Sequence, residues 1–178
     1  MPKSLQSIKT SVKFDETLEL IETSIAEKHK ILLFSQFTSM LAIFAQELQK
    51  RKIKFVQLTG ETRDRKTVID QFQNNPDYPI FLLSLKAGGI GLNLTAADYV
   101  IHYDPWWNPA VEQQATDRAH RIGQDKVVSV YKMLIKNSIE EKIQLLQEKK
   151  KDLIENIIGG NAKTGKLTKE DVMFLFAQ

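Results

Sequence analysis

Five short apolar runs, separated by segments with a different periodicity, constrain the fold of this chain more than any other feature. Each run has four to eight residues and is rich in β-branched or aromatic side chains, as strands are. The first three runs do not alternate cleanly between polar and apolar residues, which indicates strands buried on both faces. The runs cover residues 31–34, 55–58, 80–83, 99–103 and 127–134.

Segments with helical spacing lie between these runs. Before the first run, apolar residues recur in steps of four, three and four, which places them on one helical face: Phe14, Leu18, Ile21 and Ile25. Similar patterns cover 41–48 and 68–72, and Asn108 followed by Pro109 suits the start of a fourth helix. Strands that alternate with helices predict an α/β fold, in which a parallel sheet is covered by helices on both faces and its carboxyl edge carries the ligand-binding loops.

The pattern changes after Leu134. Ser138 and Glu141 have the spacing of a capping box, and an apolar stripe then follows a long helix up to the glycine pair at 159–160. A polar linker leads from there to a short helix at 168–176. We therefore expect three parts along the chain: a linker at 1–12, an α/β lobe at 13–136, and a helical extension at 137–178 that braces the lobe.

The composition narrows the class of protein. With 178 residues and 42% hydrophobic side chains, the chain suits one globular domain. Its 25 Lys and Arg against 22 Asp and Glu give a net charge of +3, which permits a local nucleic-acid patch without arguing for one. The absence of Cys and the scatter of three His predict no metal site. No apolar stretch is long enough for a membrane span or a signal peptide, so we expect an intracellular protein, in the cytoplasm or nucleoid of a prokaryote or the nucleus of a eukaryote.

The segment 114–124 is the most informative part of the sequence. On a helix, Gln114, Arg118 and Arg121 occupy positions i, i+4 and i+7 and share one face. Two guanidinium groups on one face repel each other unless an anion lies between them, and the planar fork of Arg suits phosphate oxygens. A polyphosphate site is one interpretation. A solvated face, with Asp117 and Glu112 as local ion-pair partners, is the other.

A glycine-rich loop follows the third apolar run. Ser84 and Lys86 precede three glycines, Gly88, Gly89 and Gly91, and Asn93 follows them. Backbone amides in such a loop can form a nest that binds an anion, and Lys86 adds a positive charge. A flexible loop without a ligand remains the alternative, because glycine-rich loops alone are weak signals.

Two adjacent tryptophans, Trp106 and Trp107, stand in a loop flanked by Pro105 and Pro109. Neighbouring side chains in a tight loop do not both point into one core, so we expect at least one of them to be accessible. The alternative is that both cover the edge of the core.

The order and spacing of these segments resemble the C-terminal motifs of Swi/Snf-type ATPases, which belong to helicase superfamily two. The resemblance covers about residues 12–178 and is closest in the run Asp-Arg-Ala-His-Arg-Ile-Gly-Gln at 117–124, which looks like motif six. The other matching segments are 31–38 for motif four, 58–72 for the segment after it, 84–95 for motif five and 100–109 for its extension.

The resemblance implies a fold and a function. The fold would be the second RecA-like lobe of a motor that uses ATP and translocates on double-stranded DNA. Arg118 and Arg121 would contact the γ-phosphate, with Arg121 as the main arginine finger, and both would project together from the carboxyl edge of the sheet toward a partner lobe. Gln114 would support that site, and Gly91 and Asn93 would lie near the ribose, although Asn93 stands where many helicases outside this family carry Asp. The implied contacts to the DNA are Ser35, Gln36, Gly60, Thr62, Ser84, Lys86 and Trp107.

The sequence carries only half of such an ATP site. It contains no G-x-x-x-x-G-K-[ST] loop and no acidic box for Mg²⁺, and the nearest candidate, at 160–167, ends in Leu167 where a hydroxyl is needed. ATP and Mg²⁺ would therefore be held mainly by an N-terminal RecA-like lobe, and this chain alone would not hydrolyse ATP. The expected partners are that lobe, double-stranded DNA and a DNA-bound protein complex. Two alternatives stay open: a non-catalytic module that binds nucleic acid or protein, and a helicase that separates strands.

Overall fold

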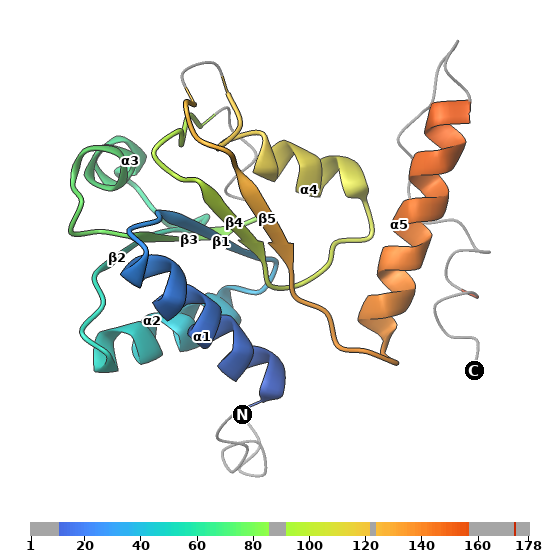
Figure 1. Ribbon diagram of the computed structural model, residues 1–178, viewed down its shortest axis with the longest axis horizontal. Helices are drawn as coiled ribbons and strands as arrows, with labels where there is room; N and C mark the ends of the chain where they lie inside the picture. The colour runs from blue at the N-terminus through green and yellow to red at the C-terminus, as the bar shows by residue number, and fades with distance from the viewer. Residues whose placement is uncertain (1–10, 86–91, 122–123, 157–172, 174–178) are drawn as a thin grey trace.

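A five-stranded parallel sheet forms the centre of the lobe, as Figure 1 shows. The computed structural model describes residues 11–85, 92–121, 124–156 and 173. The strand order is β2-β3-β1-β4-β5, and each of the four pairings is parallel, which confirms the predicted α/β fold. The strands are β1 (Ile31–Ser35), β2 (Phe55–Leu58), β3 (Ile80–Ser84), β4 (Tyr99–His102) and β5 (Ser129–Lys132).

Helices cover both faces of the sheet, as the sequence predicted (Figure 1). On one face lie α1 (Val12–Ala26) and α2 (Thr38–Lys50), and on the other lie α3 (Arg65–Asn74) and α4 (Pro109–Thr116). Each connection between parallel strands has to cross over the sheet, and helices on both faces are the usual solution.

Side-chain caps fix where three of these helices begin. The Ser11 hydroxyl accepts a hydrogen bond from the Phe14 N–H at the start of α1. Asp64 and Asn108 do the same for α3 and α4. Pro109 occupies the first turn of α4, where its missing N–H costs nothing, so the predicted start of this helix is confirmed.

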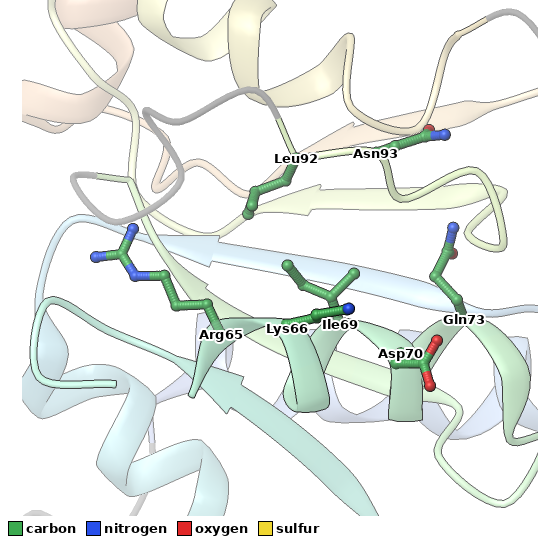
Figure 2. A pocket seen from close by; sticks show the side chains of 7 residues that line it. All are labelled: Arg65, Lys66, Ile69, Asp70, Gln73, Leu92 and Asn93. Carbon is green, nitrogen blue, oxygen red and sulfur yellow. The ribbon is translucent and has the colours of Figure 1, made fainter. Parts of the chain in front are cut away.

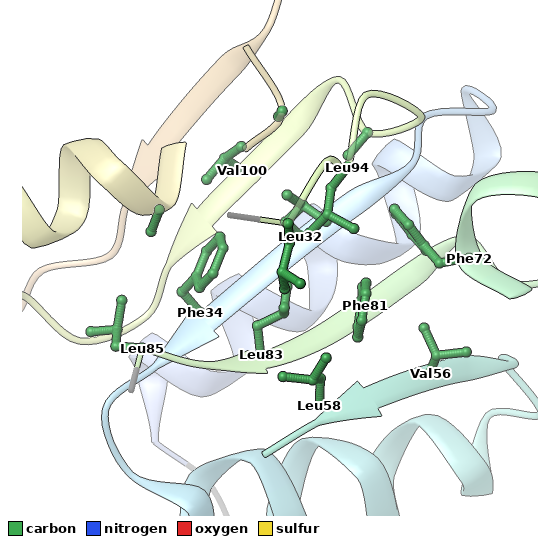
Figure 3. Packing of buried hydrophobic residues seen from close by; sticks show 14 residues of the cluster. Leu32, Phe34, Val56, Leu58, Phe72, Phe81, Leu83, Leu85, Leu94 and Val100 are labelled. Carbon is green, nitrogen blue, oxygen red and sulfur yellow. The ribbon is translucent and has the colours of Figure 1, made fainter. Parts of the chain in front are cut away.

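The core consists of two apolar layers, one on each side of the sheet. All five residues of β1 and all five of β3 are buried, because both strands lie inside the sheet between two helical layers. Figure 3 shows the layer beneath α3 and α4, in which Phe34, Phe72 and Phe81 are fully buried. Each fully buried side chain of this size stabilises the fold by roughly 1.5–3 kcal/mol. Both edge strands instead alternate. In β2 only Val56 and Leu58 are buried, so the expected burial on both faces is wrong for residues 55–58, and in β5 Val130 is 44% exposed.

The helical extension begins with α5 (Ile139–Asn156). The Ser138 hydroxyl accepts from the Glu140 N–H at 3.1 Å, as a cap should, but the Glu141 carboxylate accepts from the Asn137 N–H and not from Ser138. The predicted capping box of Ser138 and Glu141 is therefore wrong in both halves: the Ser138 hydroxyl bonds the Glu140 N–H, and Asn137, with a φ of 57°, turns its own amide toward the Glu141 carboxylate. Lys13 on α1 pairs with Glu140 at 2.7 Å and ties α5 to the lobe.

Several expectations lie outside the described residues. These are most of the linker at 1–12, the glycine pair at 159–160, the polar segment at 160–167 and the short helix at 168–176. The three proposed chain divisions remain predictions.

His102 is a buried neutral base at the end of β4. It is 1% exposed, its Nε2 lies 3.0 Å from the Thr116 hydroxyl, and its ring stacks on Phe34. Burial lowers the pKa of His102 from 6.5 to about 4; Glu112 opposes this and Lys132 adds to it. The unfolded state therefore takes up this proton first as pH falls. The stability that neutral His102 contributes is fully present above about pH 6.5 and is lost between pH 6.5 and 4.

We therefore expect the free energy of unfolding to fall by about 2 kcal/mol between pH 7 and pH 5 because of His102 alone. Urea titrations of the wild type and of His102→Gln across this range would measure it. The free energy of unfolding of the variant should fall by about 2 kcal/mol less than that of the wild type over this pH range, since its other titratable groups are unchanged. An equal fall in the two proteins would contradict a buried neutral His102.

Candidate functional site

Three of the predicted site segments begin at the carboxyl edge of the sheet. The register pairs Ser35 with Ser84 at the ends of β1 and β3. The Leu85 N–H donates to the Ser35 carbonyl at 3.1 Å, and the Tyr103 N–H donates to the Phe34 carbonyl at 2.9 Å. Because parallel strands end on the same side, the segments that follow β1, β3 and β4 begin side by side.

Asp104 joins the end of β1 to the tryptophan loop, residues 105–108. It is 7% exposed and its Oδ2 accepts hydrogen bonds from the Ser35 hydroxyl and, at 3.2 Å, from the Gln36 N–H. The Gln36 amide reaches the Pro105 carbonyl at 3.5 Å. Burial raises the pKa of the Asp104 carboxyl, while the Ser35 hydroxyl opposes this rise. The sequence analysis missed Asp104, although it directly precedes the loop that was singled out.

Two of the residues expected to touch DNA lie inside the lobe. Ser35 is 0% exposed and its hydroxyl serves Asp104, and Ser84 is 4% exposed. Neither side chain is presented to a DNA backbone in this conformation, which corrects the expected direct contacts. Gln36 is half-buried, so part of this residue stays accessible to solvent. Lys86 lies outside the described residues.

The turn after β2 is exposed and tightly bonded. The Thr62 N–H donates to the Thr59 carbonyl at 3.2 Å, and the Thr59 N–H returns a bond to the Thr62 hydroxyl at 3.0 Å. Gly60 lies at the tip of this turn, where an added Cβ would meet nothing within 4 Å. Gly60 and Glu61 are exposed in this turn, while Thr59 and Thr62 are half-buried.

A hollow of about 440 Å³ opens between α3 and the segment that follows the glycine loop (Figure 2). Arg65, in the first turn of α3, lines this hollow, and its Nη1 is buried with no hydrogen-bond partner in the described part of the chain. Asn93 is exposed at this hollow. Its lining consists of Arg65, Lys66, Ile69, Asp70, Gln73, Leu92 and Asn93. Two cations against one carboxylate make it a better host for an anion than for a cation.

The arginine segment does not continue α4. The helix ends at Thr116, so the shared helical face expected for Gln114, Arg118 and Arg121 is wrong. Tertiary contacts take the carbonyls that a longer helix would use. The Arg118 carbonyl accepts from the Leu94 N–H at 2.9 Å, and the Gln124 amide nitrogen lies 3.2 Å from the Ala119 carbonyl.

Gln124 holds this segment against the edge of the lobe. Its Nε2 also lies 2.7 Å from the Ala97 carbonyl and 3.0 Å from the Thr95 carbonyl. The arginine segment and the segment after the glycine loop are thereby joined through one side chain. Gln124 belongs to the run that carried the resemblance, but its anchoring role could not be read from spacing.

The two arginines remain close, with different exposure. Arg118 is 2% exposed, whereas Arg121 and Gln114 are exposed, so the expectation that both guanidinium groups face outward is corrected for Arg118. Burial lowers the pKa of the Arg118 guanidinium, the charge of Arg121 lowers it further, and Asp117 opposes both. The like charges of Arg118 and Arg121 therefore repel each other, and an anion placed between them would offset that repulsion.

Both tryptophans are partly exposed, which confirms that at least one of them is accessible. Trp106 packs against the core layer beneath α4, and its ring centroid lies 6.1 Å from that of Trp107. Trp107 therefore lies next to the indole of Trp106, which packs against the core.

No metal-binding group of three or more His, Cys, Asp or Glu occurs within the described ranges. Among those residues there is also no helix with the length and apolar character needed to cross a membrane. Gly91 lies outside them.

Comparison with known proteins identifies the family. The family described as Helicase conserved C-terminal domain matches residues 12–123. The putative ATP-dependent helicase/translocase YwqA of Bacillus subtilis is 43% identical over 169 residues, which is 93% of this chain and 18% of that protein. The chromatin-remodeling ATPase INO80 of Homo sapiens is 44% identical over 154 residues, 84% of this chain and 10% of that protein. The chain thus spans less than a fifth of these relatives.

Solved structures agree with the sequence match. The C-terminal part of the Fun30 ATPase domain has a TM-score of 0.78 and 38% identity, and the match covers 94% of this chain and 52% of that one. The Sulfolobus solfataricus SWI2/SNF2 ATPase core in complex with dsDNA has a TM-score of 0.70 and 38% identity, over 96% of this chain and 36% of that one. The chain therefore belongs to the helicase conserved C-terminal domain family, as a RecA-like C-terminal lobe of the Swi/Snf type.

Proposed function

We propose that this lobe supplies the arginine side of a shared ATP site, and part of the duplex-DNA surface, in a two-lobed translocase. One observation carries the proposal: the Leu94 N–H bonds the Arg118 carbonyl, which keeps the arginine segment one residue from Asn93 at the hollow. Arg65 and Lys66 line the hollow beside Leu92 and Asn93, the Arg118 backbone is bonded to Leu94, and Arg121 is close enough to Arg118 to act on its charge. A nucleotide polyphosphate would be attracted to these cations.

The two arginines have separate roles in this proposal. Bound ATP supplies the phosphoanhydride bond that is hydrolysed. Arg121, which is exposed, reaches across to the γ-phosphate and stabilises the charge that develops there, an effect typically worth about 10³–10⁵ in rate. Arg118, which is buried, holds positive charge beside it and orients the segment. Gln114, Asn93 and Gly91 support phosphate and ribose.

Mg²⁺ would be held by the other lobe. Among the described residues no three potential metal ligands come together, and Asp70 is the one carboxylate that lines the hollow, whereas the cations near 92–94 suit phosphate oxygens. The proposed partner is therefore an N-terminal RecA-like lobe that brings ATP and Mg²⁺ to the arginines. Translocation would follow from closure and reopening of the two lobes on the DNA.

The DNA surface would run along the carboxyl edge. Gln36, Gly60, Thr62 and Trp107 lie on loops that leave this edge, with Lys86 in the glycine loop. A related ATPase core has been solved with double-stranded DNA, which supports the same ligand here. A DNA-bound protein complex as the final substrate, and an intracellular site of action, follow the same reasoning from relatives named as chromatin-remodeling ATPases.

Arg121→Ala in a two-lobed protein that contains this lobe should lower kcat for ATP by about 10³-fold or more, because the finger is lost. DNA affinity should change less than about threefold, since phosphate contacts to the duplex lie elsewhere. Arg51→Ala is the matched control, because Arg51 pairs with Glu22 and Glu47 at the end of α2. Steady-state ATPase assays that gave equal kcat for the Arg121 variant and the control would refute the finger role.

The chain by itself should hydrolyse ATP no faster than the buffer background, with or without duplex DNA. It carries no G-x-x-x-x-G-K-[ST] loop to hold the phosphates. Phosphate release measured at high protein concentration is the test. DNA-stimulated turnover by this chain alone would argue for a complete site within it.

Gly60→Ala should leave the free energy of unfolding within about 1 kcal/mol of the wild type, because the added Cβ meets nothing within 4 Å. Duplex binding should nevertheless weaken severalfold, since a methyl group would stand between the backbone and a phosphate. Fluorescence anisotropy with a labelled duplex, repeated at several salt concentrations, measures this. Unchanged affinity would remove the turn at 59–62 from the DNA surface.

A further inference from the structure

A closed ring of polar contacts joins α5 to the tryptophan loop. The Trp106 N–H donates to Glu112 Oε1 at 2.6 Å, and Glu112 Oε2 lies 2.6 Å from Lys132 Nζ. Lys132 Nζ donates to Gln147 Oε1 at 3.1 Å, and the Gln147 amide donates to the Trp106 carbonyl. Each member comes from a different segment: the loop, α4, the end of β5 and α5.

The ring lies largely out of water. Glu112 is 3% exposed and Gln147 is 4% exposed, while the Lys132 side chain is 38% exposed. A buried carboxylate or amide costs free energy unless its partners are in place, so loss of one member leaves the others unsatisfied. The four members therefore stabilise one another, and together they fix one position of α5 on the lobe.

The backbone N–H and the backbone carbonyl of Trp106 are both held by this ring. Its carbonyl belongs to the peptide that leads to Trp107, so Gln147 fixes the orientation of the bond between the two tryptophans. At the other end of the loop, Asp104 is anchored to Ser35 and Gln36. The loop is thus clamped on both sides, and the clamp next to Trp107 comes from α5.

We propose that α5 is a positioning element for the tryptophan loop, in which Gln147 and Lys132 fix the Trp106–Trp107 peptide and so set how firmly Trp107 grips duplex DNA. This inference rests on the proposed DNA contact of Trp107. It assigns a function to the face of α5 that the proposed ATP and DNA surfaces do not use. Displacement of α5 would loosen the loop without touching the arginine segment.

Tryptophan fluorescence can test whether α5 positions this loop. The two tryptophans of the chain both lie in the loop, so tryptophan fluorescence of the chain reports on the loop alone. Gln147→Leu removes both the donor and the acceptor of the amide, and Lys132→Met removes the positive charge. Gln147→Glu keeps an acceptor for Lys132 but cannot donate to the Trp106 carbonyl. Gln144→Leu is the matched control, because the Gln144 amide bonds Glu148 within α5 itself.

Without DNA, acrylamide quenching of the tryptophans should increase in all three ring variants and stay at the wild-type value in the control. The double variant at 132 and 147 should add little to either single change, because the ring acts as a unit. Far-UV circular dichroism and thermal melting identify a variant that fails to fold, and Gln147→Glu, the smallest change, then decides. Wild-type quenching in a folded Gln147→Glu variant would overturn the proposal.

With a labelled duplex, the ring variants should bind about threefold to tenfold more weakly, the size expected for one lost intramolecular hydrogen bond. The salt dependence for the Gln147 variants should be unchanged, because no phosphate contact is removed. Undetectable binding by the wild type would refute the proposed DNA surface, while the quenching experiment would still test the ring. Full affinity in variants whose loop is looser would refute the coupling of α5 to DNA.

Discussion

One backbone hydrogen bond, 2.9 Å from the Leu94 N–H to the Arg118 carbonyl, supports the rest of the proposed site. It uses a carbonyl that a longer α4 would have bonded internally, and Gln124 takes the next one at Ala119. The chain therefore leaves the helix and follows the edge of the lobe. This path keeps Arg118 and Arg121 close to each other and holds the Arg118 backbone next to Leu94, one residue from Asn93 at the hollow. An uninterrupted helix would have lacked this contact.

The fold was predictable where the determinants are local. The inner strands β1 and β3 appear as apolar runs because burial on both faces demands such residues in succession. The start of α4 follows from Asn108 and Pro109. The end of α4 was not predictable, because no helix-breaking residue stands at 117. There the Arg118 N–H bonds the Ala115 carbonyl, and the residues that follow are held by Leu94 and Gln124. The partner of Glu141 was missed for a similar reason, since it follows from the φ of Asn137.

For the site, the sequence predicted which residues take part better than it predicted how they are placed. Spacing and resemblance led to Arg118, Gln36 and Trp107, but burial of a polar side chain depends on partners that are far away in sequence. Asp104 and Ser35 are 69 residues apart and meet only because β1 and β4 are neighbours in the sheet. Residues that act as anchors, among them Glu112 and Gln147, resemble ordinary surface residues of a helix until the tertiary structure shows what they touch.

The short outer strand β5 has a consequence for solubility. It is the last strand in the order of the described sheet, and an edge strand offers a row of backbone groups with which another chain can pair. With Val127 88% exposed and Val130 44% exposed, this edge would be a template for aggregation if it were long and flat. Its four residues end at Lys132, and a charged lysine at the end of a brief edge strand is a common protection against such pairing. The lysine that completes the polar ring is thus also the last residue of the sheet's outer strand.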